Sequence, residues 1–193
     1  PGLLLGQQLF LRDDFTGGFP DSAGGIGETG WAIETTVDLG ASVQPANSDN
    51  GHPGCYLMTG SPLSSTAICT ITRQRNSGTD VSCVALNDFD IFEAVIKTGP
   101  SVAAQLISVG LTDNPVASGI TGTNEFAGAT YNSVTDNWML SLRHSGTIGN
   151  TDTGIAVQAG AWYLLRVWKR GTTWYFQLGA AGDLSTVYSA SAN

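Results

Sequence analysis

The feature that most constrains the fold is Ala161 to Leu178, where two runs rich in Trp, Tyr, Phe, Leu and Val surround a short polar segment. Such a pattern predicts a β-hairpin. Gly171 can supply the positive φ that a tight hairpin turn requires. We place the loop at Arg170-Gly171 or over Lys169–Thr172. Because a one-residue slip would exchange the two faces of the hairpin, burial of its apolar face is expected to hold the register.

Side chains alternate along a strand, so the hairpin has two faces of different character. The expected loop places Trp168 opposite Thr173 and Val167 opposite Trp174. One face is apolar and is expected to be buried: Tyr163, Leu165, Val167, Trp174, Phe176 and Leu178. The other is both aromatic and polar, as in a half-exposed or ligand-facing surface: Trp162, Leu164, Arg166, Trp168, Thr173, Tyr175 and Gln177.

Composition favours many short strands joined by tight turns. The chain has 193 residues, 25 of them Gly, and only 12% are charged, against about a quarter in an average protein. No stretch has a convincing helical period. About a dozen strand-like runs separated by turn residues predict an antiparallel β-sandwich or a closed barrel rather than βαβ units. We expect a short N-terminal arm over residues 1–10 and a single sandwich domain over 11–193.

Strands are expected in runs of apolar, β-branched and aromatic residues, and loops where Gly, Asn, Asp and Ser gather. In the strand expected at 88–98, Phe92, Ala94 and Ile96 share one face, and Glu93, Val95 and Lys97 share the other. Residues 41–54 and 145–154 are interpreted as loops. The other expected strands are 9–15, 31–37, 55–59, 67–73, 81–86, 102–111, 125–132, 138–144, 155–157 and 184–189.

Two classes of partner, nucleic acids and membranes, are not expected. A formal charge of -8 and a pI of about 4.4 make a nucleic acid an unexpected partner. The longest apolar run near the N-terminus, Leu3 to Leu5, is too short for a signal peptide or a membrane span. Pro1 fits a chain whose initiator Met was removed. We therefore expect synthesis in a cytoplasm without a signal peptide, and no membrane partner.

Metal and thiol chemistry find little support in the sequence. Cys55, Cys69 and Cys83 are spaced fourteen apart with no CxxC motif, so buried free thiols are expected rather than zinc ligands. Asp and Asn gather at 49–50, 113–114, 136–137 and 150–152. Such residues build turns, which we favour, but their oxygens also suit Ca²⁺ held in a loop. No cofactor is expected.

Five segments carry a resemblance to a known family. FEAVIKTG at 92–99, VGLTDN at 109–114, NWMLSLRHSGT at 137–147, DTGIAV at 152–157 and WYLLRVWKRGTTWYF at 162–176 resemble the concanavalin A-like, laminin-G-like jelly-roll domain. In particular they resemble the versions of this domain found in tailed-phage structural proteins. The resemblance implies two large antiparallel sheets packed face to face. It covers about the last hundred residues and does not by itself decide function.

The aromatic-polar face of the hairpin is the strongest binding candidate. Trp162, Arg166, Trp168 and Tyr175 could contact a glycan, because sugar C–H faces stack on aromatic rings and Arg bonds hydroxyl groups. The alternative is structural: Arg166 could lie over Trp168 or Tyr175 as a cation–π pair.

Residues 88–93, DFDIFE, resemble the acidic strand of laminarinase-like glycoside hydrolases, in which paired carboxylates cleave the glycosidic bond. Asp88 stands where that family has its nucleophilic Glu, and the residues after Glu93 depart from the family pattern. Solvated carboxylates at a strand edge are the favoured interpretation. We expect no enzymatic activity, with a glycoside hydrolase as the remaining alternative. His52 and His144 lack a pairing motif and no catalytic triad is assigned.

These expectations combine into one hypothesis. The chain is expected to be a non-enzymatic virion structural protein of a tailed phage, either a capsid-decorating (cement) protein or an appendage β-sandwich. Its expected partners are the major capsid protein and copies of itself, through an apolar arm containing Leu3, Leu4, Leu5, Leu9 and Phe10. The alternative is a carbohydrate-binding or host-receptor-binding module that recognises a surface glycan.

Overall fold

The computed structural model describes residues 32–35, 42–45, 56–59, 69–72, 91–103, 105–112, 125–132, 134–144, 147–180 and 186–191. Every regular element in these ranges is a β-strand. No helix in the described part of the chain is long and apolar enough to cross a membrane. The strands expected at 9–15 and 81–86 lie outside the described residues.

Contacts divide the chain into two compact units, Pro1–Val84 with Pro115–Gly119 and Ala85–Asn114 with Ile120–Asn193. In the first, β1 (Ala32–Thr35) pairs antiparallel with β4 (Cys69–Thr72), and β2 (Ser42–Pro45) with β3 (Tyr56–Thr59). The expectation of a loop throughout 41–54 is therefore wrong at β2. A four-residue strand containing Gln and Pro pairs through its backbone, which apolar alternation does not reveal. The predicted arm at 1–10 and domain at 11–193 stay a prediction.

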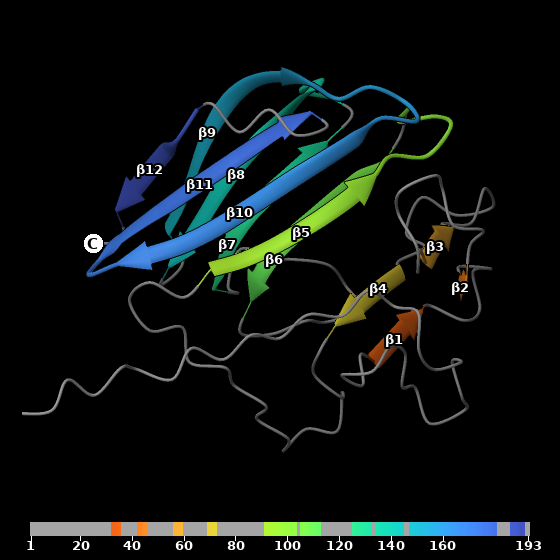
Figure 1. Cartoon of the computed structure of the whole chain (residues 1–193), viewed down its shortest axis with the longest axis horizontal. Coiled ribbons are helices and arrows are strands. Elements are labelled where there is room, and N and C mark those ends of the chain that lie inside the picture. The colour runs from red at the N-terminus through yellow and green to blue at the C-terminus, as the bar shows by residue number, and fades with distance from the viewer. Residues whose placement is uncertain are drawn as a thin grey trace, which may run out of the picture. The chain divides into compact units, whose positions relative to one another are not determined.

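The described part of the second unit is a sandwich of two four-stranded antiparallel sheets, which lie one in front of the other in Figure 1. This confirms the predicted all-β sandwich. The first sheet has the order β12 (Tyr188–Ser191), β11 (Thr173–Ala180), β10 (Trp162–Arg170), β5 (Ile91–Lys97). The second has the order β6 (Leu106–Thr112), β7 (Phe126–Asn132), β8 (Asn137–His144), β9 (Thr147–Ala156).

The core lies between the inward faces of these two sheets. Leu165 and Val167 of β10 and Trp138 of β8 have no exposed surface, and Phe176 of β11 is 1% exposed. Trp174 is partly buried and packs against this cluster. The face predicted to be buried from alternation is therefore the buried one. Burial of each such side chain contributes roughly 1.5–3 kcal/mol to folding.

The hairpin register differs from the expected one by two residues. Trp168 lies opposite Tyr175 and Val167 opposite Phe176, because the loop is Gly171-Thr172. Gly171 has φ 58°, and a two-residue loop with positive φ at its first position is of the II′ kind, which favours Gly there. A shift of two residues leaves every side chain on its predicted face. The alternation therefore predicted the faces correctly although it placed the turn one residue early.

Strand β9 corrects a second expectation. Residues 145–154 are interpreted from sequence as a loop, but Thr147–Ala156 forms a ten-residue strand paired with β8. Most of its side chains are exposed. A strand at the edge of a sheet, held by backbone hydrogen bonds, needs no apolar alternation, and its Thr, Asn and Gly residues resemble those of a loop.

Three tyrosines with inward rings place their hydroxyl groups on backbone carbonyls of neighbouring segments. Tyr131 donates to the Val102 carbonyl at 3.1 Å, and Tyr163 to the Ala156 carbonyl at 3.2 Å. Tyr188 of β12 donates to the Thr153 carbonyl of β9 at 3.1 Å, and so joins the two sheets. Each ring adds apolar area to the core while its hydroxyl is paired, as buried tyrosines require.

Candidate interaction face

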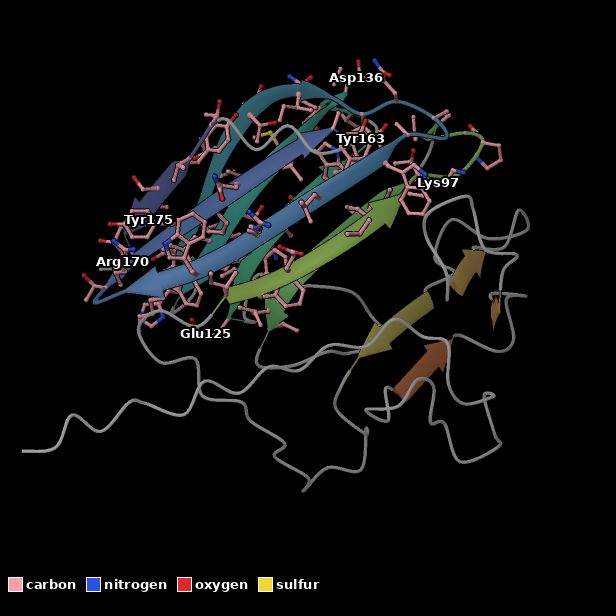
Figure 2. All side chains as sticks on the ribbon, viewed as in Figure 1. Lys97, Glu125, Asp136, Tyr163, Arg170 and Tyr175 are labelled. Atoms are coloured by element: carbon pink, nitrogen blue, oxygen red, sulfur yellow. The ribbon has the colours of Figure 1, made fainter. Side chains whose placement is uncertain are left out.

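The outward surface of the β5, β10 and β11 strands gathers the aromatic residues that sequence analysis singled out. We call it the aromatic face. The three strands are 7 to 9 residues long, and Figure 2 shows Lys97 and Tyr175 near opposite ends of the face. Its residues are Ile91, Glu93, Val95, Lys97, Trp162, Leu164, Arg166, Trp168, Tyr175 and Gln177.

Cross-strand pairing arranges this face in rows. An aromatic row joins Ile91, Trp168 and Tyr175. A polar row of Glu93, Arg166 and Gln177 comes next, and then an apolar row of Val95, Leu164 and Gly179. Lys97 and Trp162 form the last row. Directly opposed residues lie about 4.5–5.5 Å apart at Cβ, so each row is a chain of contacts.

The aromatic side chains of this face are already engaged on one ring face. Trp168 and Tyr175 stack at 5.5 Å between centroids with 11° between their planes. Rings lying side by side in one plane could not approach so closely, so they face each other. The Lys97 Nζ lies over the Trp162 ring, 5.2 Å from its centroid. The cation–π contact on this face is therefore made by Lys97, while Arg166 pairs with an acid.

Glu93 and Arg166 form an ion pair at the centre of the face. The Arg166 Nε donates to Glu93 Oε2 at 2.5 Å, and the two side chains are 38% and 47% exposed. An ion pair this exposed contributes roughly 0–1 kcal/mol. Its larger consequence is that it neutralises both charges in the middle of the surface. The backbone that positions the pair comes from β5 and β10, which are about seventy residues apart in sequence.

Two apolar side chains of this face are open to solvent. Ile91 is 63% exposed and Val95 is 50% exposed. The sequence pattern places Val95 on the same face as Glu93, but it does not show that β5 lies beside the aromatic strand β10. Apolar side chains, aromatic rings and Arg on one surface are the composition of the centre of a protein–protein interface.

The other candidates from the sequence are the carboxylates at 88–93, the N-terminal arm and a metal site. Of the carboxylates at 88–93, Asp88 and Asp90 lie outside the described residues, as do Leu3, Leu4, Leu5, Leu9 and Phe10 of the arm. Glu93 is the described member, and Arg166 holds it. No group of three or more His, Cys, Asp or Glu residues suited to a metal ion occurs in the described ranges. A calcium ion in a loop stays a prediction.

One of the Asx clusters builds backbone structure. Asp152 accepts hydrogen bonds from the Asn137 side chain at 3.1 Å and from the Gly154 N–H at 2.8 Å. This local network ties the start of β8 to the irregular part of β9.

Sequence analysis missed an acid–histidine contact. His144 Nδ1 lies 2.7 Å from Glu125 Oε2, across the β7 and β8 strands, and both side chains are well exposed. In the structure Phe126 pairs with Arg143, and the next position outward places residues 125 and 144 opposite each other, a register that the sequence alone does not give. An exposed pair of this kind is a surface contact.

Comparison of the chain with protein-family models, with curated proteins and with solved structures finds no match in any of the three.

Proposed function

We propose that this chain is a non-enzymatic virion structural protein of a tailed phage that works by making protein–protein contacts on the particle, as a capsid-decorating or appendage sandwich. The observation that supports it best is the aromatic face, where exposed Ile91 and Val95 lie beside Trp168 and Arg166. Trp, Tyr and Arg are the residues that contribute most to binding energy at protein interfaces.

Two further observations are consistent with this proposal. The described sandwich coincides with the segments that resemble phage structural domains. The carboxylate of Glu93 accepts a hydrogen bond from Arg166, which holds it within the surface rather than free to turn toward a substrate. A general acid must reach the atom it protonates before its acidity matters.

The experiment is to fractionate lysates of cells infected by the phage that encodes the chain. We expect the protein to co-sediment with purified particles at a fixed ratio to the major capsid protein, through successive gradients. Protein found only in the soluble fraction, or at a ratio that falls with each gradient, would contradict the proposal.

A glycan-binding module is a second candidate, supported by the location of Trp162, Arg166, Trp168 and Tyr175 on one face. Each stacked ring still has one face that can meet a sugar. The test is calorimetric titration of host envelope polysaccharide into the wild type and Trp168→Ala. Binding that disappears in the variant would favour this function over the first.

A further inference from the structure

The N-terminal half of β9, Thr147–Asp152, is an open strand edge. In the part of the chain that the structure describes, β9 is the last strand of its sheet and β8 is its one neighbour. All six residues of this half are exposed, and their side chains lie on both faces of the strand. Every second backbone N–H and C=O of an edge strand points away from its sheet, and an edge of this kind is a template for another strand.

The C-terminal half of β9 is protected from pairing with another strand, and this difference sets the limit of the open edge. Gly154 has φ 68°, and the register is irregular where β9 passes Trp138. Thr153 donates from its hydroxyl group to the Trp138 carbonyl at 2.7 Å and accepts Tyr188 at its own carbonyl. Bulges and covering side chains are the devices by which sheet edges avoid pairing.

The open half pairs with β8 in regular register, and its one charged residue is Asp152, at its end. Residues Thr147 to Thr151 read Thr-Ile-Gly-Asn-Thr, without Lys, Arg, Pro or any charge. The chain as a whole has a net charge of -8, so two copies repel each other overall, and a contact through an uncharged segment avoids adding close like-charge repulsion to that. Thr and Ile also favour the extended conformation that a paired strand adopts.

We propose that this half of β9 pairs edge to edge, antiparallel, with the same half of a second copy of the chain. A two-fold pairing centred on Gly149, for example, sets Thr147 opposite Thr151 and Ile148 opposite Asn150, and keeps Asp152 away from its own copy. Such a contact is isologous and closes as a dimer. The two β6–β9 sheets then continue as one sheet across the dimer. The proposal does not depend on the virion function.

The test compares Ile148→Glu with Val134→Glu. Both positions are exposed, at 47% and 85%, so neither variant is expected to lose folding stability, and both add one negative charge. Sedimentation equilibrium over a concentration series should show dimers for the wild type and for Val134→Glu. Ile148→Glu should raise the dimer dissociation constant on the order of tenfold or more, because two charges then meet near the axis.

Hydrogen exchange locates the contact. Amides in 147–152 should exchange more slowly in concentrated than in dilute wild-type protein, and the difference should disappear in Ile148→Glu. A wild type that is monomeric throughout the series would overturn the proposal. So would dimers in which 147–152 exchange at the same rate at every concentration, or in which Ile148→Glu and Val134→Glu associate equally.

Discussion

The two sheets of the sandwich have similar apolar inward faces, but their outward faces differ in side-chain composition. On the aromatic face, large side chains such as Trp168 and Arg166 are half-exposed, and two apolar ones are open to solvent. On the other sheet, small polar residues bond to one another. The Thr130 and Ser141 hydroxyl oxygens are 2.8 Å apart, and Ser141 donates to Asn150 Oδ1 at 2.8 Å.

The polar outward face is also tightly built. Ser141 is 1% exposed. Next to it Gly110 lies opposite Gly128, and the Phe126 ring covers Gly128 so closely that a Cβ there would lie 2.9 Å from the ring Cζ. The Ser141 hydroxyl group is satisfied within the sheet.

Exposed apolar side chains occur on both outward faces, Ile91 and Val95 on the aromatic face and Leu106 and Ile148 on the other. The difference is that the aromatic face sets Trp168, Tyr175 and Arg166 beside its exposed apolar side chains, and we infer from this composition that it is the face that serves a partner.

The largest effect is expected where the two sheets are alike, in the core between them. Phe176→Ala removes a ring that is 1% exposed, and should lower the free energy of unfolding by roughly 3–5 kcal/mol. Urea denaturation monitored by circular dichroism measures this. A change below about 1 kcal/mol would mean that the inward faces are wrongly assigned.

Gly128→Ala tests the tight packing of the polar outward face. The added Cβ would collide with the Val109 carbonyl oxygen and lie 2.7 Å from the Gly110 Cα. Because backbone atoms yield little, the loss should be about 1–3 kcal/mol. Gly154→Ala is unsuitable as a control because of its positive φ, but Gly149→Ala meets only one atom at 3.6 Å and should cost much less.

Ser141→Ala tests the hydroxyl ladder on the same face. The variant removes the group that joins Thr130 to Asn150, and each hydrogen bond lost costs roughly 0.5–1.5 kcal/mol. Wild-type stability in the alanine variant would show that this face does not depend on its internal hydrogen bonds.

Glu93→Gln on the aromatic face should have the smallest effect on stability. The Glu93–Arg166 pair is exposed to solvent, so the change should lie within about 1 kcal/mol. The same variant protein, incubated with laminarin and host polysaccharide, should release no reducing sugar, and neither should the wild type. Release by the wild type that disappears in Glu93→Gln would replace the structural function with hydrolysis.

Local pattern predicted much of this sandwich. Alternation assigned the faces of β10 and β11, and placed Glu93, Val95 and Lys97 on one side of β5 correctly. Strand β9 was not predicted, because an exposed edge strand has no apolar alternation. The pairing of β5 with β10 was not predicted, because it joins residues about seventy apart in sequence. No local pattern indicates which strands become neighbours.

The aromatic site residues could be predicted because local alternation was enough to group them. Trp162, Arg166, Trp168 and Tyr175 belong to one hairpin, so alternation alone places them together. Their partners Glu93 and Lys97 come from β5, so the ion pair and the cation–π contact needed the fold.

The most direct test of the aromatic face as a partner-binding surface is the number of copies retained per particle. Phage particles would be assembled with Val95→Glu or Val134→Glu in place of the wild-type chain; the two positions are 50% and 85% exposed. Melting temperatures of the free proteins should match. We expect Val95→Glu to be lost from particles through gradient purification and Val134→Glu to remain at the wild-type copy number. Equal retention of both variants would contradict the assignment of this face to a protein partner.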